Sequence, residues 1–314
     1  MTILIALGGN ALLRRGQPLT AENQLNSIKR AAEQIVQLEP NHQLILAHGN
    51  GPQIGLLALQ SAAIESAKPY SLDLLGAETD GMIGYLLEQE LSNRLAPEKV
   101  VATLLTRVEV SADDPAFLNP TKPIGAMYSQ TEAEKLAKEK HWTVKADGDG
   151  FRRVVASPKP VKILGLDSIF WLMEHHVIVI AAGGGGIPVV LSADGHSREG
   201  VDAVIDKDLC SALLAEKIAA DILLIVTDVE AVFVDWGKPT QRAIRRISPN
   251  DLEKFTFPDG SMGPKVTAAC QFANATGKAA VIGSLEQILE LVAGTAGTWI
   301  TTDCAEPVFA SSSL

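Results

Sequence analysis

Three glycine clusters in this sequence are placed where a phosphate group could bind. Each follows a short apolar run that is typical of a β-strand, and they comprise Gly8 with Gly9, Gly49 with Gly51, and the four glycines at 183–186. In an open α/β sheet, ligands bind beyond the carboxyl ends of the strands. Glycine there lets backbone amides approach phosphate oxygens, and a following helix N-terminus adds positive partial charge. The clusters together predict a phosphate-binding edge, although a tight strand-to-helix turn alone also favours glycine.

These clusters do not match the common nucleotide-binding fingerprints. Gly183 and Gly185 would need a third glycine at position 188 to form a dinucleotide-binding loop, and Pro188 stands there. The sequence contains no GxxxxGK[ST] stretch, which excludes a P-loop NTPase. A phosphate cradle built from these glycines therefore belongs to another type.

Two lysines stand where helices are expected to begin. Lys207 follows Asp206 at a predicted strand-to-helix junction, and Lys265 lies just inside a predicted helix start. A cation is locally unfavourable there, because the N-terminal end of a helix carries positive partial charge. The two placements favour a bound anion nearby, and the alternative is that both lysines are solvated. Asp206 could orient Lys207, hold a magnesium-bound water or cap the helix.

A third lysine, Lys122, lies between two prolines in a proline-rich segment at about 111–160. A stiffened backbone suits a finger that reaches into a cleft, and Arg152 and Arg153 in the same segment could serve the same purpose. All three could equally be solvated charges. Phosphoryl transfer consists mostly of positioning and charge neutralisation, which is chemistry that such cations perform.

Other kinds of site find little support in the sequence. The Gly-x-Ser-x-Gly nucleophile motif is absent, which fits direct in-line transfer without a covalent intermediate. His175, His176 and His196 have no carboxylate or cysteine at ligand spacing, so no metal site is expected. His48 follows an apolar run and is expected to be a hydrogen-bonded core histidine rather than a base.

Strand-like runs alternate with helical patterns along the chain. Strands are expected at 2–7, 43–47, 100–105, 177–182, 222–226 and 279–282, and helices at 21–38, from 52, at 74–95, at 209–218 and from 264. This alternation predicts an α/β fold with a mostly parallel sheet and helices on both faces. The segment at about 111–160 breaks the rhythm and is expected to be an irregular inserted sub-domain or lid; a floppy surface excursion is the alternative.

Composition narrows the class of protein. The chain has 314 residues, of which 46% are hydrophobic and 5% aromatic, a mix that favours buried parallel strands over a β-sandwich. A net charge of -10 argues against nucleic acid as a partner. Three distant cysteines predict neither a disulfide framework nor a zinc site and favour a reducing compartment. The apolar start reads as a strand rather than a signal peptide, and the longest apolar stretch, 177–191, is too short to cross a membrane. A soluble cytoplasmic protein is expected.

The motifs, in this order, resemble the carbamate kinase branch of the amino acid kinase family. The resembling segments are 6–11, 48–53, 119–125, 152–158, 183–189, 203–208 and 260–262 with 264–265. The match runs from Ile3 to about Ile300. It implies one domain over 1–314, folded as a three-layer αβα sandwich with a mainly parallel sheet and a small protruding sub-domain, and it implies a homodimer. The implied reaction is reversible phosphoryl transfer between ATP and carbamate, giving ADP and carbamoyl phosphate, with Mg²⁺.

The resemblance also implies roles for individual residues. Lys207 and Lys265 would hold the transferred phosphoryl group, and Asp206 would position those lysines. Lys122 would reach in from the sub-domain. The residues implied to bind nucleotide, phosphate and acceptor are Gly8, Gly9, Asn10, Gly49, Asn50, Gly51 and Met262.

Two alternatives to a carbamate kinase stay open from the sequence. One is a sibling kinase acting on acetylglutamate, glutamate or a nucleoside monophosphate. Such relatives usually start with Lys-x-Gly-Gly, whereas Ala6 stands at that lysine position, and carbamate kinases also lack the lysine there. The other is a non-catalytic nucleotide-binding subunit, against which the retained lysines argue. For carbamate, already an anion, the barrier is repulsion between two anions rather than proton removal.

Three positions depart from the family pattern. Gly263 stands where leucine is common, Asp80 where glutamine is usual, and Asp149 where arginine is frequent. Two added acids near an anion site could weaken acceptor binding or change the acceptor.

Overall fold

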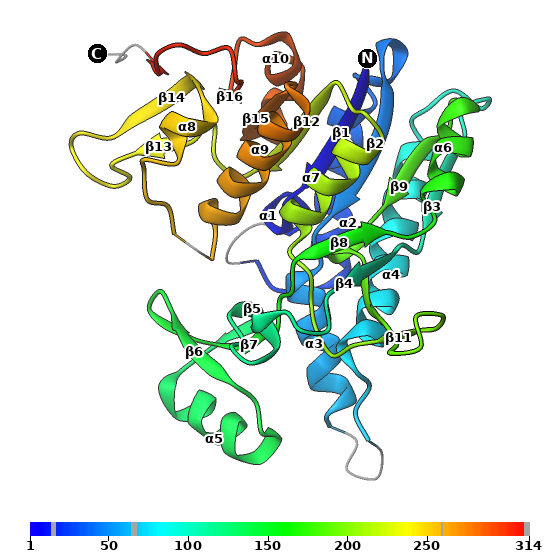
Figure 1. Ribbon diagram of the computed structural model, residues 1–314, viewed down its shortest axis with the longest axis vertical. Coiled ribbons are helices and arrows are strands. Elements are labelled where there is room, and N and C mark those ends of the chain that lie inside the picture. Colours follow the sequence, from blue (N-terminus) through cyan, green and yellow to red (C-terminus); the bar gives the residue numbers. More distant parts are fainter. Residues whose placement is uncertain (14–16, 64–67, 259, 311–314) are drawn as a thin grey trace.

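The computed structural model describes residues 1–13, 17–63, 68–258 and 260–310, and for residues 10 and 11 it describes the backbone alone. A ten-stranded sheet runs through it in the order β13-β14-β16-β15-β12-β1-β2-β9-β3, with β17 paired to β14. The six strands from β15 to β3 along this order are mutually parallel. Figure 1 shows helices on both faces of this sheet. The predicted α/β class with a mostly parallel sheet is confirmed.

The six parallel strands are the six strands expected from the sequence. Their bounds are β1 Thr2–Leu7, β2 Gln43–His48, β3 Val101–Leu104, β9 Ile178–Ala181, β12 Ile222–Thr227 and β15 Ala279–Ser284. The remaining strands of the sheet are β13 Phe233–Val234, β14 Arg242–Ile247, β16 Thr298–Ile300 and β17 Val308–Phe309. The central strands are apolar along their whole length because both faces of a parallel sheet are covered.

The two faces of the sheet pack against different helices. Leu4 and Ala6 of β1 belong to the hydrophobic cluster under α7 and α9, whereas Ile3 and Ile5 belong to the cluster under α2 and α4. This division follows from the two-residue period of a strand. The helices are α1 Gly9–Leu12, α2 Ala21–Ile35, α3 Gly51–Ser61, α4 Leu72–Ser92, α6 Leu166–Glu174, α7 Lys207–Lys217, α8 Pro249–Leu252, α9 Met262–Thr276 and α10 Ile288–Ala293. No helix in the described ranges is both long and apolar enough to cross a membrane.

A smaller sheet lies beside the main one and carries the sub-domain. Its order is β11-β10-β4-β8, with β4 Arg107–Val110, β8 Pro160–Ile163, β10 Ile187–Leu191 and β11 Arg198–Gly200. The chain between β4 and β8 forms a separate sheet in the order β5-β7-β6, from β5 Lys122–Tyr128, β6 Val144–Asp147 and β7 Gly150–Val155, together with α5 Gln130–Lys140. Figure 1 shows this unit protruding from the body at the lower left. The segment expected to be irregular therefore contains three strands and a helix.

Candidate active site

The glycine turns meet at one edge of the sheet because the strands before them are parallel. Gly8 follows β1, Gly49 follows β2, and Gly183 follows β9 after one intervening residue. The Gly8 amide donates to the Val226 carbonyl of β12 at 2.9 Å, and the Gly49 amide donates to the Leu7 carbonyl at 3.0 Å. The predicted phosphate-binding turns are therefore neighbours in space.

Close packing explains why some of these positions are glycine. A Cβ added to Gly8 would lie 2.8 Å from the Val226 carbonyl oxygen, and one added to Gly49 would lie 3.2 Å from Cδ of Lys207. By contrast, a Cβ at Gly9 or Gly51 would meet no atom within 4 Å. The first pair thus serves packing, while the second pair faces open space that a ligand can fill. Asn10 begins the same turn, but its side chain lies outside the described part of the chain.

Two local expectations about helix starts were wrong. The turn at 183–186 leads into strand β10 rather than a helix, and positive φ angles of 67°, 95° and 82° at Gly184, Gly185 and Gly186 redirect the chain. These angles lie in the left-handed region that glycine adopts without strain. Residues 201–206 form no regular strand before Lys207. The first two glycine turns do lead into helices, α1 and α3.

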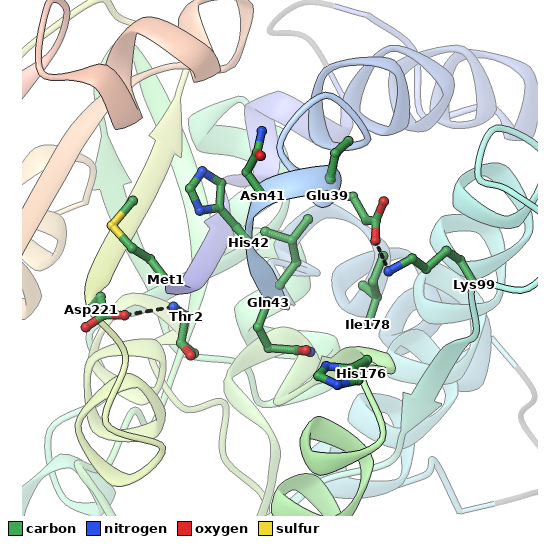
Figure 2. Close-up of a pocket in the computed structure, with 12 residues that line it drawn as sticks. Met1, Thr2, Glu39, Asn41, His42, Gln43, Lys99, His176, Ile178 and Asp221 are labelled. Carbon is green, nitrogen blue, oxygen red and sulfur yellow. Dashed lines mark hydrogen bonds and ion pairs between the residues drawn. The ribbon is translucent and has the colours of Figure 1, made fainter.

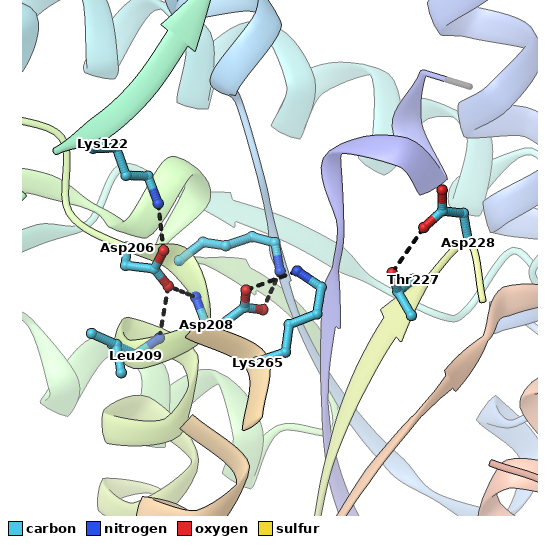
Figure 3. A network of polar contacts seen from close by, with 8 residues as sticks. Lys122, Asp206, Asp208, Leu209, Thr227, Asp228 and Lys265 are labelled. Carbon is cyan, nitrogen blue, oxygen red and sulfur yellow. Dashed lines mark hydrogen bonds and ion pairs between the residues drawn. The ribbon is translucent and has the colours of Figure 1, made fainter. Parts of the chain in front are cut away.

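The three predicted lysines converge at the start of α7. Lys207 is the first residue of that helix and is ion-paired with its neighbour Asp208. Lys265, on α9, places Nζ 3.1 Å from the other carboxylate oxygen of Asp208. Lys122, the first residue of β5, is ion-paired with Asp206. Figure 3 shows Lys122 and Lys265 reaching toward these two carboxylates from separate parts of the fold.

Asp206 combines two of its expected tasks in one geometry. Its Oδ1 accepts hydrogen bonds from the backbone amides of Asp208 at 2.9 Å and Leu209 at 3.3 Å, so it caps α7. Its Oδ2 is paired with Lys122. The carboxylate that is paired with both Lys207 and Lys265 is not Asp206 but Asp208, which sequence reasoning did not single out. The alternation of acid, lysine and acid at 206–208 was the available signal.

Burial makes the charges of this cluster strong. Lys207 and Asp208 are 8% and 3% exposed. Burial lowers the pKa of Lys207, while Asp208 beside it partly opposes that shift. Burial would raise the pKa of Asp208, but the ammonium groups of Lys207 and Lys265 outweigh it and hold that pKa well below its usual range. Three ammonium groups against two carboxylates leave one net positive charge, which suits an anionic ligand.

The other predicted cations stay within the sub-domain. The Arg153 guanidinium lies 4.2 Å from the centre of the Trp142 ring, and Arg152 pairs with Asp147 at 3.4 Å. Met262 begins α9 and packs against the core cluster under that helix. Of the predicted cations, the lysines therefore gather at the sheet edge and the two arginines do not.

The three departures from the family pattern have distinct surroundings. Asp149 is exposed in the turn between β6 and β7. Gly263 donates its amide to the Pro258 carbonyl at 2.9 Å, and an added Cβ would lie 3.1 Å from that oxygen, so a leucine would require Pro258 to move. Asp80, on α4, is completely buried beside His48. His48 is thus the core residue that its position predicted, with a buried carboxylate as its partner.

A hollow of about 530 Å³ opens at the opposite edge of the sheet, near the amino ends of the central strands (Figure 2). Its polar side chains already have partners. Asp221 accepts from the Thr2 amide at 2.9 Å, Gln43 donates to the Val177 carbonyl at 2.7 Å, and Lys99 pairs with Glu39. This hollow therefore offers less ligand chemistry than the lysine cluster.

Comparison with known proteins agrees with this geometry. The model of the amino acid kinase family matches residues 1–284. A carbamate kinase from Haemophilus influenzae is 59% identical over 96% of this chain and 97% of its own, and one from Escherichia coli K12 is 52% identical over 96% and 99%. A solved carbamate kinase from Giardia lamblia bound to citric acid has a TM-score of 0.89 at 35% identity, covering 96% of this chain and 98% of that one. The chain belongs to the amino acid kinase family, in its carbamate kinase branch.

Proposed function

We propose that this chain is a carbamate kinase, which transfers a phosphoryl group reversibly between ATP and carbamate and in the cell runs toward ATP. The observation that carries the proposal is the net positive cluster of Lys122, Lys207 and Lys265 at the glycine-lined edge of the sheet. Carbamate is an anion, so its attacking oxygen needs no general base. What the reaction requires is relief of the repulsion between two anions brought into line.

Each group of the cluster has a task in this mechanism. Lys207 and Lys265 hold the transferred phosphoryl group from the main body, and Lys122 adds a third cation from the sub-domain. Asp206 and Asp208 fix the ammonium groups, so that little reorganisation is needed during transfer. The open sides of Gly9 and Gly51 leave room for the phosphate and a very small acceptor.

The nucleotide is ATP or ADP, and Mg²⁺ enters with it. A carbamate kinase from Giardia lamblia has been solved with AMP-PNP, an analogue of ATP, at 37% identity to this chain. Within the described ranges, no group of three or more His, Cys, Asp or Glu side chains is arranged to hold a metal. This fits an ion that the nucleotide phosphates carry in, because Mg²⁺ at such sites is bound largely by phosphates and water.

Two copies of the chain form a homodimer in this proposal, and the cytoplasm is where it works. Leu74 and Tyr85 lie three turns apart on α4 and are 50% and 61% exposed, a pattern that favours a covered face. Cys210, Cys270 and Cys304 are free, which suits a reducing compartment. Light scattering of the purified protein tests the dimer directly, and a monomeric mass would refute it.

The decisive test is ATP formation from ADP, Mg²⁺ and carbamoyl phosphate. Wild type should form ATP, and Lys207→Ala should lose about 10²–10³ in rate because a buried cation at the transferred group is gone. Lys217→Ala is the matched control, since Lys217 lies at the end of the same helix, exposed and paired with Glu216. A folded wild type that binds ADP but forms no ATP would refute the acceptor and direct attention to glutamate, acetylglutamate or nucleoside monophosphates.

A further inference from the structure

A buried histidine–carboxylate pair lies directly behind the glycine turns. His48 ends β2 and Asp80 lies in the middle of α4, and both side chains are 0% exposed. His48 Nε2 is 3.4 Å from Asp80 Oδ1, and His48 Nδ1 is 3.3 Å from the Gly49 carbonyl oxygen. Whichever ring nitrogen carries the proton, its N–H therefore faces an oxygen acceptor. None of the roles proposed above uses this pair.

The pair is pressed against the third glycine turn. A Cβ added to Gly183 would lie 1.9 Å from Asp80 Oδ1 and 2.4 Å from His48 Nε2. A Cβ added to Gly184 would lie 2.2 Å from Asn50 Nδ2. The turn can occupy this place only because both positions are glycine, so the backbone at 183–184 rests on these side chains.

A single turn of α4 grips both sides of Gly49. Asp80 contacts His48, the residue before Gly49, and the neighbouring Thr79 accepts a hydrogen bond of 2.8 Å from Asn50 Nδ2, the residue after it. Gly49 in turn lies against the aliphatic stem of Lys207, at 3.2 Å from a Cβ position to Cδ. A continuous path of contacts thus runs from α4 through the Gly49 turn to a lysine of the cluster.

The pair is costly for the fold. Within the described part of the chain, both carboxylate oxygens of Asp80 and His48 Nε2 lack a hydrogen-bond partner of normal geometry. Burying such groups without full hydrogen bonding is unfavourable, and apolar replacements of similar shape are often neutral or stabilising. A buried polar pair beside a site is therefore better explained by what it positions than by stability.

We propose that Asp80 and Thr79 are positioning residues, which fix the 48–50 turn and through it the acceptor wall and Lys207. The inference rests on the proposed function, since it assigns the acceptor to this wall. Loss of the grip should weaken the use of carbamoyl phosphate and leave the binding of ADP unchanged. Supporting residues behind a site typically contribute roughly 10- to 100-fold.

The experiment compares removal with conservative replacement at both positions. Asp80→Ala and Thr79→Val remove the acceptor atoms, and each should lower kcat/KM for carbamoyl phosphate by roughly 10- to 100-fold at an unchanged KM for ADP. Asp80→Asn keeps an oxygen facing His48 and Thr79→Ser keeps the hydroxyl, so both should recover most of the loss. Glu78→Gln, which removes an exposed carboxylate from the same helix, is the control and should match wild type.

The outcomes separate the two proposals. Wild-type activity with unchanged kcat/KM in all four variants would overturn the positioning role alone. Equal rises in both KM values, together with a lower melting temperature and no recovery in Asp80→Asn or Thr79→Ser, would also overturn it, because that pattern marks general destabilisation. A wild type that makes no ATP from carbamoyl phosphate would overturn the proposed function and this inference together. If Asp80→Ala does not fold, Asp80→Asn and the Thr79 pair still decide the question.

Discussion

Lys122 and Asp206, 84 residues apart in the sequence, are ion-paired between the first strand of the sub-domain and the residue that caps α7. The pair connects the position of the sub-domain to the helix start that carries Lys207. Because Asp206 also accepts two backbone amides of α7, it is held on both sides. The sub-domain therefore contributes both a charge and a constraint on where that charge lies.

Replacing Lys122 should impair catalysis far more than stability. Lys122→Met keeps the length of the stem and removes the cation, and we expect a loss of about 10²–10³ in kcat for ATP formation. The melting temperature should change little, since Asp206 keeps its two backbone hydrogen bonds. Lys145→Met, on the exposed strand β6 of the same sub-domain, is the control and should behave as wild type. Equal rates for the two variants would refute a role for Lys122.

Asp208→Asn should destabilise the protein as well as inactivate it. The substitution keeps the shape of the side chain but leaves two buried ammonium groups without their shared counter-ion, which costs about 3–5 kcal/mol of unfolding free energy. Glu216→Gln breaks an exposed pair on the same helix, where the side chain is 36% exposed, and should cost less than about 1 kcal/mol. Chemical denaturation of both variants gives the comparison, and similar losses would show that burial of Asp208 is unimportant.

Activity should fall at a lower alkaline pH than an ordinary lysine would dictate. Burial lowers the pKa of Lys207 from its ordinary 10.5, so its charge is lost before that pH is reached. Between the folded and unfolded pKa values the unfolded chain binds the extra proton, so this group makes the free energy of unfolding rise with pH there. A pH profile of kcat, with denaturation at the same pH values, should therefore show activity falling without a parallel loss of stability from Lys207. An alkaline limb at or above 10.5 would contradict this.

The strands of the main sheet were predictable because each is a short, continuous apolar run. In a parallel sheet both faces are covered, so the strand signal does not depend on a partner. The sub-domain was harder, because prolines made it look irregular. Pro123 lies in β5, an edge strand, which is where proline is tolerated in a sheet. The capping box of Ser129 and Glu132 was the missed signal for α5.

Residue types alone did identify the lysines, because a cation at a helix start is locally unfavourable. The carboxylates that hold them were harder to assign. Asp208 pairs with Lys265 across 57 positions, and Thr79 meets Asn50 across 29. Such contacts depend on how α4, α7 and α9 pack on the sheet, which a local pattern does not encode. The same holds for Asp80, whose partner His48 is on another element.

The sub-domain meets the body through two glycines, and this contact should set the position of Lys122. A Cβ added to Gly55 of α3 would lie 2.0 Å from Cα of Gly125 in β5, backbone against backbone. Gly55→Ala must therefore push β5 away, costing about 1–3 kcal/mol of stability and, through misplacement of Lys122, about 10²-fold in kcat. Gly84→Ala creates a comparable clash, 2.3 Å from Thr103 Cγ2, far from that lysine. It should lose similar stability in thermal denaturation and keep its kcat; a matching loss of kcat in both variants would show that destabilisation alone explains the effect.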